Sequence, residues 1–319
     1  MTVRCAVLDD YQDVALRMAD WSGLAGQVDV TVHQHHFDTE DDLVAALREQ
    51  EIVVIMRERT PFTAGVFERL PALRLLITSG MRNASVDLAA AAAAGVTVCG
   101  TASSSEPPVE LTWALVLGLA RNLVPENNAL RANGPWQTTV GTGLAGRTLG
   151  LLGFGKIGGK VARIGQAFGM DVMAWSANLT DDRTEPAGVR LAATKEELLA
   201  GSDVLSVHLV LSDRTRGLLD AAALRLMRPT ALLVNTSRAA IVDQQAMVRA
   251  LREGWIAGAG VDVFEQEPLP ADHVLRTLPN LLATPHLGYV TDSNYRTYFR
   301  ETVENIQAFL AGSPVRVLG

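Results

Sequence analysis

One glycine-rich turn constrains the fold more than any other part of this 319-residue chain. The apolar run from Thr148 to Leu152 predicts a buried parallel strand, and a helix is expected to open near Gly159. Between them the first glycine of a GxGxxG pattern permits a tight turn, the second lets the backbone approach a pyrophosphate, and the third lets helix and strand pack closely. The pattern predicts a dinucleotide site, with a purely structural glycine turn as the alternative. The expected cofactor contacts are Gly153, Gly155, Lys156, Ile157 and Gly158.

The next strand, residues 171–175, lacks the acid that usually follows it. A carboxylate about 20 residues beyond the glycines would bind the ribose 2′-hydroxyl of NAD and repel the 2′-phosphate of NADP. Ser176, Ala177 and Asn178 stand there instead. Ser176 and Asn178 can bond the ribose hydroxyls, and Arg183 can reach a 2′-phosphate. The sequence leaves NAD and NADP as equal alternatives.

Length and composition restrict the class of protein. A chain of 319 residues exceeds one ordinary core, so two domains are expected. The hydrophobic content of 48% and charged content of 20% are typical of a soluble globular protein. The net charge of −7, without a basic block, argues against a nucleic-acid partner, and no apolar run has transmembrane length. The first residues read as a strand, and Cys5 and Cys99 as reduced thiols, which favours a cytoplasmic protein.

The order of predicted elements favours an α/β fold with two doubly wound parallel sheets. Strands are expected at 3–8, 28–32, 52–56, 75–78 and 96–98, and helices at 11–21, 38–48 and 87–94. A polar linker at 101–108 leads into an apolar helix, 109–121, expected to cross between domains. Further strands are predicted at 148–152, 171–175, 204–208, 231–235, 258–263 and 281–284, and a last helix at 293–311. The substrate domain is then 1–101 plus 290–319, split by an inserted dinucleotide-binding domain, 102–289, across a cleft that can hinge.

Three polar residues follow predicted strands of the inserted domain. Arg238, Glu267 and His286 are candidates to converge, because ligands of open α/β sheets bind outside the carboxyl ends of the strands. A guanidinium can grip a carboxylate, an imidazole can give a proton to a carbonyl oxygen, and a carboxylate can orient that imidazole. Each residue also has an alternative role. Arg238 can form a surface ion pair, Glu267 can be a solvated loop charge, and His286 can form a hydrogen bond within its loop.

Five motifs lie along the chain, at 149–158, 202–208, 234–243, 260–264 with Glu267-Pro268, and Thr284-Pro285-His286. Together they resemble the D-isomer-specific 2-hydroxyacid dehydrogenase family over essentially the whole chain. The resemblance implies two Rossmann-like lobes, the substrate lobe being flavodoxin-like, and reversible reduction of a small 2-keto acid such as glyoxylate or hydroxypyruvate. It implies that Arg238 binds the substrate carboxylate and carbonyl, that His286 is the acid/base with Glu267 as partner, and that Asp262 holds the nicotinamide carboxamide. His208 and Thr236 are implied to line the cofactor site with Arg238 and His286.

The same resemblance implies a substrate-binding loop at Ser79–Asn83, whose backbone N–H groups bind the carboxylate. Gly80, Met81 and Arg82 belong to this loop, and Arg82 stands where a glycine is usual. It either adds charge to the pocket or faces solvent. Arg57 matches a substrate contact of some members, with an ordinary salt bridge as the alternative. Tyr289 and Tyr295 either wall the substrate pocket or pack against the last helix.

Other functions are alternatives to the reduction of a 2-keto acid. Glu267 argues against formate oxidation, because related formate dehydrogenases carry glutamine there, while phosphite oxidation stays an alternative. A nucleotide-sensing, corepressor-like binding protein is the alternative outside enzymes. The histidines at 33, 35 and 36 lack an acid or cysteine at a ligand spacing, so no metal is expected. A homodimer is expected through the nucleotide lobe, and the apolar helix from Val109 is compatible with that.

Overall fold

The computed structural model describes residues 2–319, and the chain divides into two compact units. The first unit contains the chain up to Ser104 together with Val290–Gly319, and the second is Ser105–Tyr289. The boundary lies three residues beyond the expected 101/102. Side chains of the last helix hold the intervening residues, because Asn294 Oδ1 accepts the Ser104 N–H at 3.0 Å and the Tyr298 hydroxyl lies 2.8 Å from that of Ser103.

The first unit is built on a five-stranded parallel sheet in the order β2-β1-β3-β4-β5. Two of its three interior strands, β3 and β4, are buried along their whole length, as expected for a parallel sheet covered on both faces. The strands are β1 (Val3–Val7), β2 (Val28–Val32), β3 (Ile52–Ile55), β4 (Leu75–Thr78) and β5 (Thr97–Cys99). The helices are α1 (Glu40–Leu47), α2 (Ala64–Arg69), α3 (Leu88–Ala93) and α11 (Asp292–Leu310), with a 3₁₀ turn η1 (Ser22–Leu24).

The helix predicted at 11–21 is wrong. The carboxylate of Asp10 accepts the backbone N–H groups of Val14 and Ala15 at 2.9 and 2.8 Å, and Asp13 adopts a positive φ of 53°. Trp21 Nε1 closes the segment by donating to the Ala15 carbonyl at 3.0 Å. These local side-chain bonds satisfy the backbone in turns and so replace the helical hydrogen bonds.

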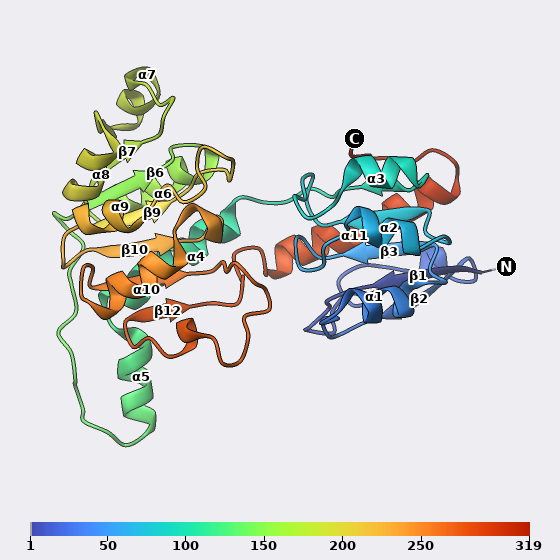
Figure 1. Cartoon of the computed structure of the whole chain (residues 1–319), viewed down its shortest axis with the longest axis horizontal. Helices are drawn as coiled ribbons and strands as arrows, with labels where there is room; N and C mark the ends of the chain where they lie inside the picture. The colour runs from blue at the N-terminus through green and yellow to red at the C-terminus, as the bar shows by residue number, and fades with distance from the viewer. Residues whose placement is uncertain (1) are drawn as a thin grey trace. The chain divides into compact units, whose positions relative to one another are not determined.

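The second unit contains a seven-stranded parallel sheet in the order β12-β11-β10-β9-β6-β7-β8 (Figure 1). The chain reverses its winding direction between β6 and β9, which is the switch point where α/β sheets bind ligands. The predicted α/β class with two parallel sheets is confirmed. The strands are β6 (Thr148–Leu152), β7 (Asp171–Trp175), β8 (Arg190–Leu191), β9 (Val204–Val207), β10 (Leu232–Asn235), β11 (Gly258–Val261) and β12 (Leu281–Ala283). The helices are α4 (Glu106–Ala120), α5 (Leu123–Arg131), α6 (Lys156–Ala167), α7 (Asp181–Thr184), α8 (Lys195–Gly201), α9 (Ala221–Leu226) and α10 (Gln244–Arg252), with the 3₁₀ turns η2 (Glu185–Ala187), η3 (Ala239–Ile241) and η4 (Val274–Arg276).

Helix α4 begins earlier than predicted and lies within one unit, whereas the sequence predicts that it crosses between the two. It begins at Glu106 and includes Pro107 and Pro108 in its first turn, where a missing N–H costs nothing. It lies wholly in the second unit and does not cross between the two. Its buried residues include Trp113, Leu115 and Val116, which pack in the core with strands β6 and β10. Helix α5, which follows it, has no buried residue.

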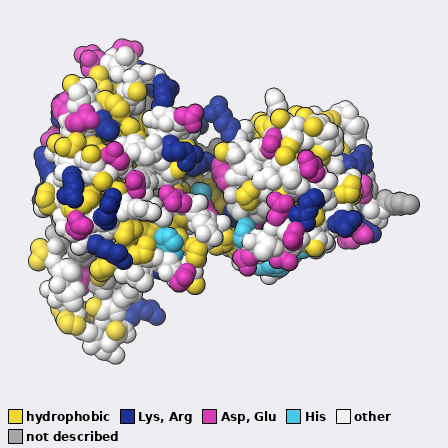
Figure 2. Space-filling view, in the orientation of Figure 1, with side chains coloured by type: hydrophobic (Ala, Val, Ile, Leu, Met, Phe, Trp, Pro, Cys, Tyr) yellow, Lys and Arg dark blue, Asp and Glu magenta, His cyan; other side chains and the backbone are white. Residues whose placement is uncertain are grey.

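Charged side chains lie on the surface (Figure 2), whereas both cysteines are buried. Acidic and basic side chains are interspersed on the face seen in Figure 2. Cys5 and Cys99 are buried free thiols, and burial raises the pKa of Cys5 to about 12 and that of Cys99 to about 11. Over residues 2–319 no helix is long and apolar enough to cross a bilayer, and no cluster of histidine, cysteine or acidic side chains is arranged as a metal site.

Candidate active site

The glycine turn has the geometry of a phosphate cradle. Gly153 has φ +107°, and a Cβ there would lie 2.7 Å from the His208 carbonyl carbon and oxygen, so only glycine fits. A Cβ on Gly158 would lie 2.3 Å from the Gly153 oxygen. A Cβ at Gly155 would meet no atom within 4 Å, and no side chain caps the N-terminus of α6. The turn therefore offers open space and uncapped N–H groups, with Lys156 and Ile157 in the first helical turn, which fits a dinucleotide pyrophosphate.

The end of β7 lies directly beside this turn. The Gly153 N–H donates to the Trp175 carbonyl at 2.9 Å, so Ser176 follows at the edge of the cradle. Ser176 is partly exposed, and Ala177 and Asn178 are exposed. Arg183, on α7, donates from Nη2 to the carbonyl oxygen of Phe154 inside the glycine turn at 3.3 Å. No carboxylate stands at 176–178.

The remaining candidates follow neighbouring parallel strands and lie on the same sheet edge. His208 follows β9, Thr236 and Arg238 follow β10, and His286 follows β12. His208 Nε2 lies 2.8 Å from the Ser206 hydroxyl, and burial lowers the pKa of His208 to about 4, so the ring is neutral at pH 7. The Thr236 hydroxyl lies 2.8 Å from that of Thr112 on α4, a contact that the sequence did not indicate.

His286 and Glu267 are brought together as a pair. His286 Nδ1 lies 2.6 Å from Glu267 Oε2, and Glu267 Oε1 accepts the Phe264 N–H at 2.9 Å. The side chains are only 18% and 24% exposed. Tyr289, which is buried, presents its ring to the imidazole in an edge arrangement with centroids 5.2 Å apart. Glu267 therefore fixes the orientation of the imidazole and leaves Nε2 as the nitrogen that can exchange a proton with a ligand.

Asp262 holds the loop that carries His286. Its side chain is 1% exposed, and Oδ1 accepts the Thr284 hydroxyl and the Leu287 N–H, both at 2.7 Å. Oδ2 accepts the Gly288 N–H at 2.8 Å. His286 lies between these anchors with a φ of +52°. Burial raises the pKa of Asp262, while these hydrogen bonds and the charge of His286 oppose the shift. The family resemblance implies only a cofactor role for Asp262. Its position after a buried strand is the one sequence signal for its second role, which is to hold the loop that carries His286.

Arg238 comes from the strand between β9 and β11. Its Nη1 donates to the Ser237 carbonyl at 2.8 Å, and buried Asn235 donates from Nδ2 to the Arg238 carbonyl at 3.0 Å. Strand β11 alone separates β10 from β12, so Arg238 and His286 leave the sheet two strands apart on one edge. The arrangement supplies a cation and an acid/base group near the carboxyl ends of the same strands.

In the first unit, the predicted substrate loop follows β4. Gly80, with φ +90°, donates its N–H to the Thr101 hydroxyl at 2.9 Å, so this N–H is not available to a ligand. Within residues 2–319 the N–H groups of Met81 and Arg82 have no hydrogen-bond acceptor, and both residues are exposed. The N–H group of Gly80 is engaged by Thr101, whereas those of Met81 and Arg82 are open to a ligand, and the role of this loop in substrate binding stays a prediction.

Arg57 follows β3 in the same unit and is held tightly. Its φ is +54°, and Asn83 Nδ2 donates to its carbonyl oxygen at 2.6 Å. The guanidinium donates to the Ser79 carbonyl at 3.3 Å and pairs with Glu58, with Nε and Oε2 3.5 Å apart. A Cβ on Gly80 would lie 2.2 Å from Arg57 Nη1, so the guanidinium lies against the substrate loop. Tyr295, in contrast, contacts Arg59 through its hydroxyl at 3.5 Å and packs on Tyr298 and Phe299.

Comparison with known proteins agrees with this arrangement. Residues 113–288 match the family model described as D-isomer specific 2-hydroxyacid dehydrogenase, NAD binding domain. A glyoxylate reductase of Aeropyrum pernix is 38% identical over 77% of this chain and 76% of its own, and a glycerate dehydrogenase of Methylorubrum extorquens is 31% identical over 91% and 96%. A phosphoglycerate oxidoreductase structure from Vibrio cholerae superposes with a TM-score of 0.93, at 37% identity, covering 98% of this chain and all of that one. The chain therefore belongs to the D-isomer specific 2-hydroxyacid dehydrogenase family, whose cofactor is a nicotinamide dinucleotide.

Proposed function

We propose that the protein reversibly reduces a small 2-keto acid, glyoxylate or hydroxypyruvate, to the 2-hydroxy acid, which is the D-isomer where that product is chiral. The bound dinucleotide, NAD or NADP, supplies or accepts the hydride. The observation that carries the proposal is the 2.6 Å contact between His286 Nδ1 and Glu267, on the sheet edge that also holds the glycine turn. Relatives named glyoxylate reductase and glycerate dehydrogenase support the substrate class.

Each residue has one task in this reaction. His286 Nε2 gives a proton to the carbonyl oxygen during reduction and takes it back during oxidation. Glu267 stabilises the protonated imidazole and keeps its ring in one orientation, as a neighbouring carboxylate does. Arg238 binds the substrate carboxylate and polarises the carbonyl, a role that suits a planar guanidinium with several donors.

For the first unit, we propose that the substrate loop binds the carboxylate with the Met81 and Arg82 N–H groups. Arg57, whose guanidinium lies against Gly80, adds positive charge to this loop. For the second unit, the proposed cofactor contacts are the glycine turn at 153–158, Ser176, Asn178, His208, Thr236 and Asp262. The open space at Gly155 and the uncapped helix α6 support the phosphate part of this assignment.

The test is an absorbance assay with glyoxylate, hydroxypyruvate and pyruvate, each with NADH and with NADPH. We expect oxidation of the reduced cofactor with glyoxylate, which gives the achiral glycolate, or with hydroxypyruvate, which gives D-glycerate, or with both. Tight dinucleotide binding without turnover of any keto acid would overturn the enzyme proposal in favour of a nucleotide-sensing binding protein. Turnover of phosphite alone would replace the substrate class.

We also propose that two copies associate through helix α5 and the segment that follows it. In Figure 1 helix α5 projects away from the sheet of the second unit, and the segment after it runs back along one side of that unit. Leu130 and Trp136 are 55% and 81% exposed, and Val140 is 98% exposed. Large apolar side chains left exposed along one short stretch of chain favour a subunit interface. Helix α4, whose apolar sequence is compatible with an interface, has Val109, Trp113, Leu115 and Val116 packed in the core of this unit.

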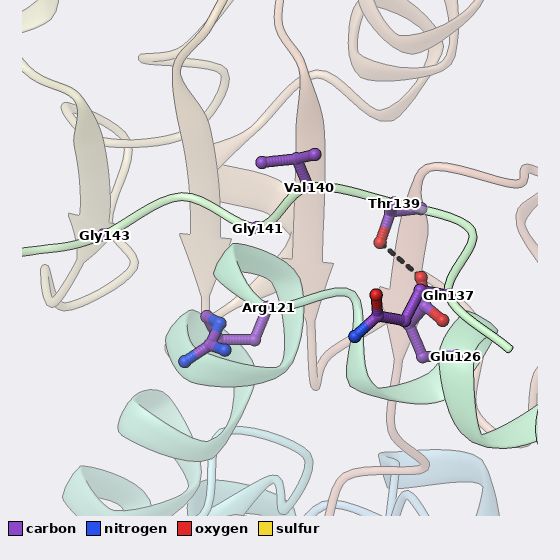
Figure 3. Close-up of a pocket in the computed structure, with 7 residues that line it drawn as sticks. All are labelled: Arg121, Glu126, Gln137, Thr139, Val140, Gly141 and Gly143. Atoms are coloured by element: carbon purple, nitrogen blue, oxygen red, sulfur yellow. Dashed lines mark hydrogen bonds between the residues drawn. The ribbon is translucent and has the colours of Figure 1, made fainter.

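This segment lines a pocket of about 520 Å³ that is open to solvent (Figure 3). Thr139 closes one side by donating to Glu126 Oε1 at 2.6 Å, the contact drawn as a dashed line. The residues that line the pocket are Arg121, Glu126, Gln137, Thr139, Val140, Gly141 and Gly143.

A further inference from the structure

We propose that the cofactor is NADP(H), with Arg183 binding the 2′-phosphate and Ser176 taking the place of the repelling acid. The inference rests on the proposed function only in assuming that a dinucleotide binds at the glycine turn. It concerns the adenosine half of that cofactor, whereas the keto-acid chemistry concerns the other half. Binding of adenosine fragments can therefore test it independently of turnover.

The position of the missing acid is fixed by a backbone contact. The Gly153 N–H donates to the Trp175 carbonyl, so residue 176 lies at the rim of the phosphate cradle. In dinucleotide folds a carboxylate there binds both ribose hydroxyls and repels a 2′-phosphate. Ser176 is neutral, partly exposed and able to donate a hydrogen bond, and it is followed by Ala177 and Asn178. The ribose end of the site therefore contains no group that excludes a phosphate.

Arg183 places a positive charge at the same rim. Its Nη2 donates to the Phe154 carbonyl oxygen at 3.3 Å, and Phe154 is the second residue of the GxGxxG turn. A guanidinium has five N–H donors, so most remain for a phosphate. Within residues 2–319 Arg183 forms no ion pair, whereas the nearby Arg190 pairs with Glu197. An arginine held at the cradle without an anionic partner is suited to a ligand phosphate.

Two acids precede Arg183 on α7, but they do not cancel its charge. Asp181 and Asp182 are exposed and stand two and one residues before it. Side chains at these spacings on a helix point in different directions, unlike those three or four residues apart. The guanidinium reaches toward the glycine turn, as its bond to Phe154 requires.

The experiment measures dissociation constants of 2′,5′-ADP and 5′-ADP by calorimetry, and of NADPH and NADH by quenching of tryptophan fluorescence, with Trp175 next to the site. We expect 2′,5′-ADP to bind about 10-fold or more tightly than 5′-ADP, the size of one charge-assisted contact. Arg183→Ala should abolish this difference and leave 5′-ADP binding unchanged. Arg183→Lys should keep part of it, and Ser176→Asp should reverse it. Arg190→Ala is the matched control and should change neither constant.

Several results would overturn the inference. Equal or tighter binding of 5′-ADP by the unaltered protein would contradict it, and so would equal losses for both fragments in Arg183→Ala, which would give Arg183 a merely structural role in the turn. If the fragments behave as expected but no keto acid is reduced with NADPH, the proposed function fails while this inference stands.

Discussion

At the residue scale, the pairing of His286 with Glu267 makes the clearest prediction. His286→Ala should lower kcat by about 100-fold or more, because general acid–base catalysis contributes at least that much. The dissociation constant of the reduced cofactor should stay within about twofold, since the glycine turn is untouched. Stopped-flow absorbance and fluorescence titration measure the two quantities. Unchanged turnover would remove His286 from the proposed mechanism.

Asp262 makes a different prediction, because its carboxylate anchors both sides of His286. In Asp262→Asn one oxygen becomes an NH₂ group that cannot accept the Gly288 N–H, so the loop loses an anchor. We expect kcat to fall by about 10-fold or more and the Leu287 and Gly288 amides to exchange hydrogen faster, while 5′-ADP binding is unchanged. Hydrogen exchange followed by mass spectrometry or NMR provides the readout.

Thr284→Val is the matched control for Asp262. This substitution removes one hydrogen bond to Asp262 Oδ1 and keeps the carboxylate. Its effect on hydrogen exchange and on kcat should therefore be smaller than that of Asp262→Asn. Wild-type exchange at Leu287 and Gly288 in Asp262→Asn would contradict the anchoring role. If Asp262→Asn also binds NADPH more weakly while its affinity for 5′-ADP is unchanged, that result would support the carboxamide contact that the family resemblance implies.

The residues of the site differ in how far the sequence could predict them. The order strand, glycine turn, helix is local, so residues 148–158 could be interpreted directly. His286 and Glu267 are 19 residues apart along the chain, and their contact follows from the fold that the motifs indicated. The hold of Asp262 on 284–288 could not be predicted, because it depends on the path of a loop from the neighbouring strand. The same is true of Thr101, which occupies the Gly80 N–H.

At the element scale, buried strands were predicted well and polar or atypical helices were not. The apolar runs at 52–55 and 75–78 have no other stable place than a covered parallel sheet. The segment at 11–21 has helical composition, yet one aspartate before it captures two backbone N–H groups and stops the helix from forming. The two prolines at 107 and 108 made this segment resemble a linker. Proline is nevertheless compatible with a first helical turn, and α4 begins there.

Helix α5 and the segment after it lead to a prediction about assembly. A double substitution of Leu130→Asp and Trp136→Asp should convert a dimer to a monomer, because it places two charges in the proposed apolar interface. Light scattering coupled to gel filtration measures the mass. Val210→Asp alters another exposed apolar residue of the same unit, 77% exposed, and should leave the dimer intact. A monomeric wild-type protein at micromolar concentration would refute the interface.

At the scale of the whole molecule, the first unit is assembled from both ends of the chain. Helix α11 contributes Tyr298, Phe299 and Ile306, which are at most 1% exposed. Phe299→Ala should lower the free energy of unfolding by about 3–5 kcal/mol, as large core truncations do. Because the glycine turn belongs to the other unit, affinity for 5′-ADP should be unchanged in the folded variant. Urea denaturation and calorimetry check both statements, and a parallel loss of affinity would contradict this separation.

The split course of the first unit also bears on biosynthesis. A ribosome releases the β1–β5 region early, yet the helix that covers part of its core is translated only after the continuous 185-residue body of the second unit, Ser105–Tyr289. The nucleotide-binding half can fold as soon as it emerges, whereas the half made first waits with apolar surface open to chaperones. Nascent-chain stalling before residue 290 should therefore leave a protease-sensitive N-terminal region beside a protease-resistant one.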